Sequence, residues 1–106
     1  MENKRILLVE DNKVNLRIAK YMLEEEKALV DVARNGQEAV DMFSENKVGR
    51  YDLILMDIMM PVMNGLDATK AIRDLDRADA KTVPIIAMTA NAFAEDVARC
   101  KEAGMN

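Results

Sequence analysis

Short apolar runs alternate along the chain with stretches in which apolar residues recur at helical spacing. Four short runs are candidates for buried strands, the second being the weakest: residues 6–9, 30–33, 53–56 and 85–88. Apolar residues recur at helical spacing within residues 14–23, 39–43, 68–75 and 93–103. Strands that are apolar on both faces and alternate with helices predict an α/β fold, a parallel sheet covered by helices. Right-handed crossovers are expected between successive strands.

Glycine and proline residues divide these segments. Gly36 is expected to break the chain before the second helix, Pro61 and Gly65 mark a loop, and Gly104 is expected to end the last helix. Residues 74–81 are highly charged and are interpreted as a helix–strand connection without chemistry. We find no linker, repeat or low-complexity tract, so residues 1–106 are expected to form one domain.

Polar residues stand where three of the four predicted strands end. Glu10 and Asp11 follow the first run, Asp57 follows the third, and Thr89 follows the fourth. Parallel sheets place ligand sites beyond the carboxyl ends of their strands. The sequence therefore predicts that these side chains meet in space, although they lie far apart along the chain.

Such a cluster suits a hard divalent cation and phosphoryl chemistry. Neighbouring carboxylates raise one another's pKa by repulsion, which a bound cation relieves. Oxygen ligands favour Mg²⁺, which takes one or two carboxylates together with phosphate oxygens. A carboxylate beside Mg²⁺ can also act as the nucleophile toward phosphorus, and the Thr89 hydroxyl can hold a phosphoryl oxygen.

The composition excludes several other classes of function. The chain has no histidine, which removes serine–histidine and cysteine–histidine catalysis and histidine metal sites. Its one cysteine, Cys100, cannot form an intrachain disulfide, and a reducing cytoplasmic location is expected. No apolar run approaches the ~18 residues of a membrane span, so no membrane insertion is expected. A net charge of −4 without a basic stripe argues against direct nucleic-acid binding.

Four stretches of the chain resemble the receiver domains of two-component response regulators, three of them around the predicted strand ends. The matching segments are Ile6-Leu7-Leu8-Val9-Glu10-Asp11-Asn12, Asp52 to Gly65 around Met56-Asp57-Ile58-Met59-Met60-Pro61, and Pro84-Ile85-Ile86-Ala87-Met88-Thr89-Ala90-Asn91-Ala92. The segment from Cys100 to Asn106 also matches, and the motifs keep their order and spacing. The amino-acid sequence of these segments is most similar to that of receivers attached to hybrid sensor histidine kinases.

The resemblance implies a phosphoacceptor and a magnesium site. Asp57 would accept a phosphoryl group from a phosphohistidine on a partner, either a sensor histidine kinase or a histidine phosphotransfer protein. Asp11 would bind Mg²⁺ directly, Glu10 would help through water, and the backbone carbonyl of Met59 would complete the protein ligands. The chain would catalyse only its own phosphorylation and slow dephosphorylation, without turnover as an enzyme.

The resemblance also implies a switch. Thr89 would hydrogen-bond a phosphoryl oxygen and move toward it, and the backbone N–H of Ala90 would lie beside the same group. Met59 and Asn91 resemble positions that tune hydrolysis, and neither readily delivers a general base to water, so slow dephosphorylation is expected. Phosphorylation would thereby shift the surface conformation.

The family's fold is a flavodoxin-like, doubly wound three-layer sheet of strand order 2-1-3-4-5. Its fifth strand carries a switch aromatic residue and ends in a lysine, and a last helix follows; neither element is matched before Asn106. An uncovered fourth strand would present an apolar edge, so self-association through that edge is expected. We expect a product of these 106 residues to be marginally stable or oligomeric, and to be phosphorylated poorly.

Four alternatives remain open on the sequence. A haloacid-dehalogenase-like phosphatase would need a second aspartate where Met59 stands. A copper(I) site could use the methionines Met56, Met59, Met60 and Met63. A calcium loop from Asp11 is disfavoured by Lys13 and Leu16. The last alternative is a phosphorylation-independent interaction module or inactive receiver fragment, which would keep partner binding after Asp57→Asn.

Overall fold

The computed structural model describes residues 3–46, 49–57, 65–88, 104 and 105. In the described residues the strands are β1 (Arg5–Val9), β2 (Leu29–Ala33), β3 (Leu53–Asp57) and β4 (Ile85–Met88). The helices are α1 (Lys13–Glu25), α2 (Gly36–Glu45), α3 (Gly65–Arg73) and the short 3₁₀ helix η1 (Ala78–Lys81). The predicted helix over residues 93–103 lies outside the described residues.

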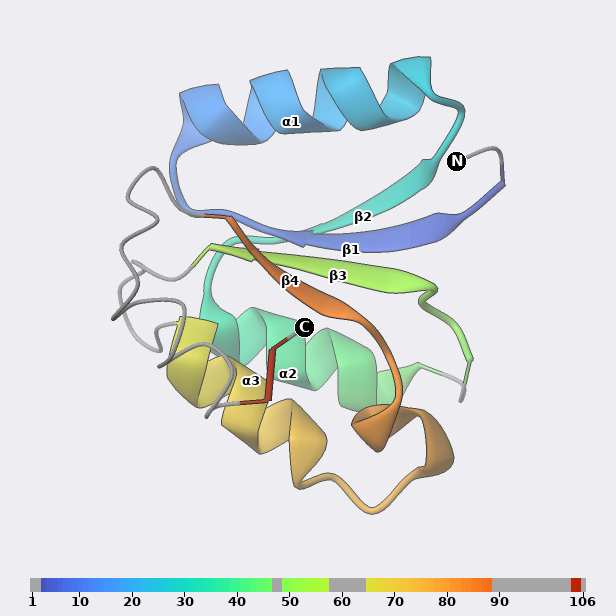
Figure 1. Cartoon of the computed structure of the whole chain (residues 1–106). Coiled ribbons are helices and arrows are strands. Elements are labelled where there is room, and N and C mark those ends of the chain that lie inside the picture. The colour runs from blue at the N-terminus through green and yellow to red at the C-terminus, as the bar shows by residue number, and fades with distance from the viewer. Residues whose placement is uncertain (1–2, 47–48, 58–64, 89–103, 106) are drawn as a thin grey trace.

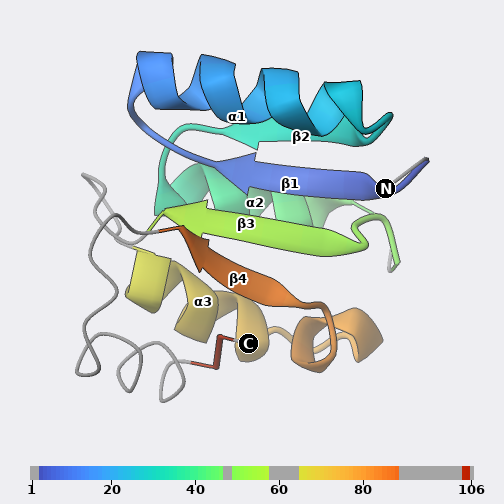
Figure 2. The same cartoon turned by 45° about the horizontal axis from the view of Figure 1, so that its top comes forward.

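The four strands form one parallel sheet of order β2-β1-β3-β4. Helix α1 lies on one side of the sheet, and α2 and α3 lie on the other, which gives three layers (Figures 1 and 2). The predicted α/β class and strand order are therefore confirmed. The strands are parallel because each connection returns the chain to the end of the sheet at which the strands begin.

The main core lies between the sheet and the α2–α3 layer. Leu7, Val9, Ile54 and Met56 alternate along β1 and β3 and are fully buried in this core. Phe43 of α2 joins the same core, which also contains the following buried residues: Ala33, Ala39, Tyr51, Ala68, Ile72, Ala80, Val83, Ile85 and Met105. Burial of Met56 in this core fits the packing role of that methionine rather than a metal ligand.

One glycine begins a helix rather than breaking the chain before it. Gly36 is the first residue of α2, and Gly65 is the first described residue of α3. Asn35 explains the first case, because its side chain accepts a hydrogen bond from the N–H of Glu38 at 2.8 Å. The break predicted at Gly36 is therefore wrong by one position: the chain turns at Asn35 and Gly36 is already helical.

Helix α1 has the predicted periodicity, but few of its apolar side chains are removed from solvent. Val14, Ile18, Tyr21 and Met22 are 55–65% exposed, while Leu16 and Leu23 are half-buried. These four exposed residues recur at helical spacing and form an apolar stripe on the solvent side of α1. The periodicity predicted the helix correctly, but this stripe lies outside the core.

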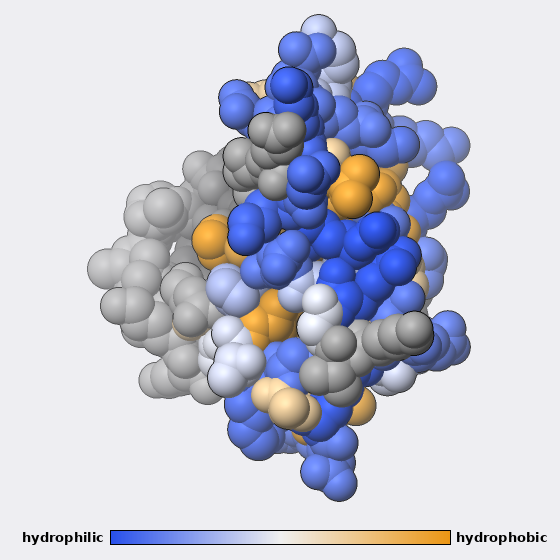
Figure 3. Space-filling view, turned by 90° about the vertical axis from the view of Figure 1, so that its right-hand side faces the viewer, coloured by the Kyte–Doolittle hydropathy of each residue, from blue (hydrophilic) through white to orange (hydrophobic). Residues whose placement is uncertain are grey.

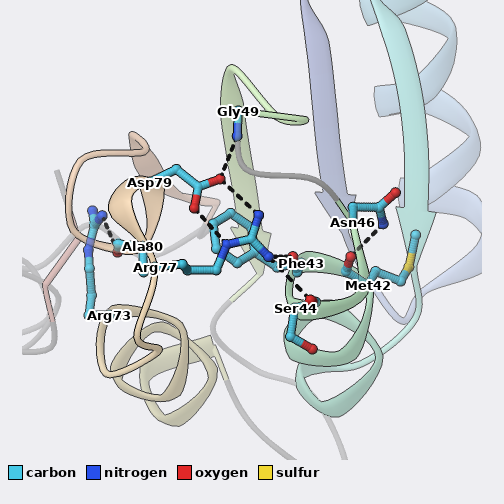
Figure 4. Close-up of polar contacts among 9 residues, drawn as sticks. All are labelled: Met42, Phe43, Ser44, Asn46, Gly49, Arg73, Arg77, Asp79 and Ala80. Atoms are coloured by element: carbon cyan, nitrogen blue, oxygen red, sulfur yellow. Dashed lines mark hydrogen bonds and ion pairs between the residues drawn. The ribbon is translucent and has the colours of Figure 1, made fainter.

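The charged connection between α3 and β4 is more ordered than its composition suggests. The Arg77 guanidinium forms a two-bonded ion pair with Asp79, with contacts at 2.7 and 3.1 Å, and lies 4.7 Å from the centre of the Phe43 ring. It also donates to the carbonyls of Phe43 and Ser44 in the last turn of α2 (Figure 4). Asp79 accepts a further bond from the N–H of Gly49 at 2.8 Å. Arg77 therefore joins η1 to the end of α2 and to the loop that enters β3.

The protonation of Asp79 follows from these contacts. Burial alone would raise the pKa of Asp79, but the bonds from Arg77 and from the Gly49 N–H outweigh it and lower that pKa. Both side chains of the ion pair are only 12% exposed. The carboxyl group of Asp79 is consequently held in the charged form at neutral pH, although the ion pair is largely removed from water.

We expect Arg77→Ala to lower the free energy of unfolding by about 2–4 kcal/mol, because it leaves a buried carboxylate and two helix carbonyls without their partner. Arg77→Lys should recover less than half of the loss, since an ammonium group cannot make the same planar set of bonds. Urea unfolding measures both, with Arg17→Ala on the exposed side of α1 as control. A loss for Arg77→Ala no larger than for Arg17→Ala would contradict this role.

Hydrophilic residues dominate the side of the molecule where the strands begin, with only separate hydrophobic groups among them (Figure 3). On the opposite side, where the strands end, Glu10 and Asp11 follow β1, and Asp57 is the last residue of β3. None of the helices within the described parts of the chain has the length and apolar character needed to cross a membrane.

Candidate functional site

Three acids cluster at the carboxyl ends of β1 and β3, and this cluster is called the acidic pocket below. One carboxylate oxygen from each of Glu10, Asp11 and Asp57 lies within 4.8 Å of the others. The strand register explains this, because Val9 of β1 pairs with Met56 of β3, so the next residue on each strand carries an acid into the same place. The predicted convergence of the acids at these two strand ends is thus observed.

The topology places this pocket at the switch point of the sheet. The chain passes from β1 outward to β2, and then crosses to β3 on the other side of β1. The helices that follow β1 and β3 therefore lie on opposite faces of the sheet, and ligands of such sheets bind at this switch point. Asp57 is half-buried and Asp11 is exposed, so a small ligand can reach both.

Glu10 is the most buried of the three acids. It is 7% exposed, its N–H donates to the carbonyl of Ala33 at 3.0 Å, and its carboxylate accepts the N–H of Asn12 at 3.1 Å. Burial is the main cause that raises the pKa of Glu10 to about 7; the Asn12 bond lowers it, and Asp57 and Asp11 raise it further. At neutral pH the pocket therefore holds a proton or needs a cation.

We expect the metal-free chain to lose stability as the pH rises from about 4.5 to 7. Glu10 is protonated in the folded state across this window but ionised in the unfolded state, so folding is favoured at the acidic end and the gain is lost through pH 7. The change should be about 1–3 kcal/mol and should vanish in Glu10→Gln. Urea unfolding in EDTA measures it, with exposed Glu24→Gln as control; an identical slope in Glu10→Gln would contradict the assignment.

The donor set fits a hard divalent cation. The three ligands that the pocket offers are carboxylate oxygens, and the chain has no histidine that could favour zinc or copper(II). An acid as buried as Glu10 among two further acids is unfavourable without positive charge nearby. The acidic cluster could therefore hold Mg²⁺.

Several predicted site residues fall outside the described residues. The side chain and carbonyl of Met59, and all of Thr89, Ala90 and Asn91, belong to this group. The register of β4 places Met88 opposite Asp57, and Thr89 is the next residue along the chain. Their roles stay predictions.

One residue next to the pocket was not assigned a role from the sequence. Asn12 is the N-cap of α1, and its side-chain oxygen accepts the N–H groups of Val14 and Asn15, both at 3.0 Å. The available signal was an asparagine directly before an amphipathic helix, which is typical of an N-cap.

Comparisons with known proteins agree with this geometry. A protein-family model described as the response regulator receiver domain matches residues 6–106. This chain belongs to that family. Receiver domains are signalling modules of two-component and phosphorelay systems, and the predicted family is confirmed.

The curated relatives are mostly much longer histidine kinases. The chain is 44% identical over 112 residues to hybrid signal transduction histidine kinase B of Dictyostelium discoideum, which covers 97% of this chain and 6% of that protein. It is 40% identical over 131 residues to probable histidine kinase 1 of Oryza sativa subsp. indica, covering 96% of this chain and 13% of the rice protein. This receiver therefore spans only a small part of such relatives.

Solved receiver structures share the fold. The receiver domain of sensor histidine kinase PA1611 from Pseudomonas aeruginosa superposes with a TM-score of 0.86 at 42% identity, covering 98% of this chain and 81% of that one; it has a magnesium ion coordinated in its active-site cleft. The receiver of Ssk1 from Saccharomyces cerevisiae was crystallised with the histidine phosphotransfer protein Ypd1. It superposes with a TM-score of 0.85 at 34% identity, and the match covers 99% of this chain and 76% of that one.

Proposed function

We propose that this receiver accepts a phosphoryl group on Asp57 from a phosphohistidine of a partner protein. The observation that carries the proposal is the convergence of three carboxylates within 4.8 Å at the ends of β1 and β3. The chain has no histidine, so the donor must be another protein or domain. A sensor histidine kinase or a histidine phosphotransfer protein fits this requirement.

The transfer exchanges one bond to phosphorus for another. A carboxylate oxygen of Asp57 attacks the phosphorus in line, the O–P bond forms as the N–P bond breaks, and the imidazole nitrogen keeps the electron pair. Bound Mg²⁺ would neutralise the charge on the phosphoryl oxygens. Asp11 and Asp57 would hold the ion directly, Glu10 would act through water, and the Met59 carbonyl would supply a further ligand.

The remaining predicted residues complete the proposal. The Thr89 hydroxyl and the Ala90 N–H would hold phosphoryl oxygens, and the segment after β4 would thereby shift between two surface states. Met59 and Asn91 would slow hydrolysis, because neither delivers a general base to water. Residues 1–106 would act as a signalling module in the cytoplasm without turnover as an enzyme.

Phosphorylation by a small-molecule donor tests this proposal. The chain is incubated with acetyl phosphate and Mg²⁺, or with EDTA in place of Mg²⁺, and the intact mass and the modified peptide are determined by mass spectrometry. We expect one phosphoryl group in the peptide containing Asp57, present only with Mg²⁺ and removed by hydroxylamine, which cleaves acylphosphates. Labelling of a serine or threonine, or equal labelling in EDTA, would contradict the proposal.

The exposed stripe of α1 supports a protein as the natural donor. This helix begins two residues after Asp11, so a protein that brings a phosphohistidine to Asp57 can also rest on its apolar stripe. Lys13, Arg17 and Lys20 form a basic edge along the same helix, and all three are exposed. An apolar stripe with a basic edge fits a donor surface that is apolar with acidic residues beside it.

We expect Ile18→Glu to slow transfer from a phosphorylated histidine phosphotransfer protein by at least about tenfold, while labelling by acetyl phosphate stays unchanged. The reason is that the change places a charge in the docking stripe without touching the pocket. Leu29→Glu, which alters a 45% exposed leucine at the start of β2, is the matched control and should transfer normally. Equal rates for Ile18→Glu and the unmodified chain with the protein donor would exclude docking through α1.

A further inference from the structure

Asn12 links the acidic pocket to helix α1 through three separate groups. Its side-chain oxygen accepts two of the free N–H groups in the first turn of α1, those of Val14 and Asn15. Its own N–H donates to the buried carboxylate of Glu10 at 3.1 Å, and its carbonyl accepts the N–H of Leu16 at 2.8 Å. One residue thus fixes both the start of the helix and the orientation of an acid in the pocket.

The position of Asn12 in the chain makes these bonds relevant to the pocket. Only three residues, Glu10 to Asn12, connect the end of β1 to the first residue of α1. Two of the three carry carboxylates of the pocket. Asn12 itself has extended backbone angles, φ −81° and ψ 119°, so the chain turns into the helix immediately after it.

Asp11 depends most on this arrangement. It is exposed, so surrounding side chains do little to fix it, whereas Glu10 is held by burial. Its backbone is fixed because Asn12 on one side and the end of β1 on the other are hydrogen-bonded. A ligand that is already ordered costs less entropy when it binds a cation than one that must first be ordered.

We propose that Asn12 is a positioning residue of the metal site, which holds residues 10–12 in the conformation that brings the three carboxylates together. The proposal rests on the proposed function, in which this pocket binds Mg²⁺. Asn12 does not contact the ion in this account. It acts by capping α1, so that Asp11 and Glu10 are in place before the ion arrives.

A second asparagine in the chain provides a matched control. Asn35 is the N-cap of α2, and its side chain accepts the N–H of Glu38 at 2.8 Å and donates to the carboxylate of Glu38 at 3.3 Å. Its side chain therefore does for α2 what that of Asn12 does for α1. The difference lies in the backbone: the N–H of Asn12 donates to Glu10, whereas the observed bonds of Asn35 run to Glu38 and Ala39 and not to the acids of the pocket. Loss of either cap should destabilise the fold by a similar amount.

The experiment compares Mg²⁺ affinity, measured by calorimetric titration, with the free energy of unfolding in EDTA for four chains: unmodified, Asn12→Ala, Asn12→Ser and Asn35→Ala. We expect Asn12→Ala to bind Mg²⁺ about tenfold more weakly, as when other indirect supports of metal ligands are removed. Asn12→Ser should bind within about threefold of the unmodified chain, because serine also caps helices. Asn35→Ala should be destabilised like Asn12→Ala and yet bind Mg²⁺ within about twofold of the unmodified chain.

The outcomes separate this inference from the proposed function. Normal Mg²⁺ binding by Asn12→Ala, or equal weakening in Asn35→Ala, would overturn the inference while leaving the proposed function intact. Failure of Asn12→Ser to recover affinity would also overturn it, because the cap would then not be the cause. Failure of the unmodified chain to bind Mg²⁺ at millimolar concentration would overturn the proposed function, and the inference with it.

Discussion

Asp57→Asn should abolish acylphosphate formation, with a loss of at least about a thousandfold relative to the unmodified chain. An amide oxygen is a far weaker nucleophile than a carboxylate, and the remaining acids cannot replace it without moving the site of attack. The fold should persist, because asparagine has nearly the same shape as aspartate and Asp57 is only half-buried. Mass spectrometry after treatment with acetyl phosphate and Mg²⁺ measures the effect.

Asp41→Asn is the control for this substitution, since Asp41 lies on the exposed side of α2 and binds only Gln37 through its side chain among the bonds observed. It should be phosphorylated at the normal rate. Phosphorylation of Asp57→Asn at a rate comparable with that of Asp41→Asn would show that the phosphoacceptor is elsewhere. Partner regulation that survives in Asp57→Asn would instead favour the phosphorylation-independent module.

Asp11→Asn should weaken Mg²⁺ binding by about 100-fold or more, because it removes a direct anionic ligand, whereas loss of indirect support costs about 10–100-fold. In the metal-free chain the same change should raise the free energy of unfolding by up to about 1 kcal/mol, because it relieves repulsion with Glu10 and Asp57. The two effects have opposite signs. Calorimetric titration and urea unfolding with and without Mg²⁺ measure them.

Asp41→Asn again serves as control and should change neither quantity. A variant Asp11→Asn that is destabilised in EDTA and still binds Mg²⁺ normally would mean that Asp11 supports the fold rather than the ion. The sign of the metal-free effect is therefore as informative as the loss of affinity.

Much of the fold follows from local patterns in the sequence. Runs such as residues 6–9 and 53–56 are apolar on both faces, which is characteristic of strands inside a parallel sheet, and both lie in the centre of the sheet. The acids directly after these runs had to meet because β1 and β3 are neighbours. Family resemblance then supplied the strand order, which the apolar pattern alone does not determine.

The Arg77 cluster shows what the sequence does not reveal. Residues 74–81 have the composition of a solvated loop, and the main partner of Arg77 outside its own turn, the Phe43 carbonyl, lies 34 positions away. The exposed stripe of α1 was similarly hidden, because helical spacing of apolar residues does not say which side of the helix meets the sheet. Contacts between distant segments decide both features.

The roles of Met59, Thr89, Ala90 and Asn91, and self-association through the β4 edge, stay predictions. Each depends on segments outside the described residues or on a second chain. The Asp11→Asn and Asp57→Asn experiments do not depend on them.

Anomalous diffraction from crystals soaked in Mn²⁺, a cation with oxygen ligands like those of Mg²⁺, tests the central claim most directly. The account predicts one strong peak at the carboxyl ends of β1 and β3, within coordination distance of carboxylate oxygens of Asp11 and Asp57. The peak should disappear in crystals of Asp11→Asn. A pocket without a peak at millimolar Mn²⁺, or an ion bound only elsewhere on the surface, would contradict the account.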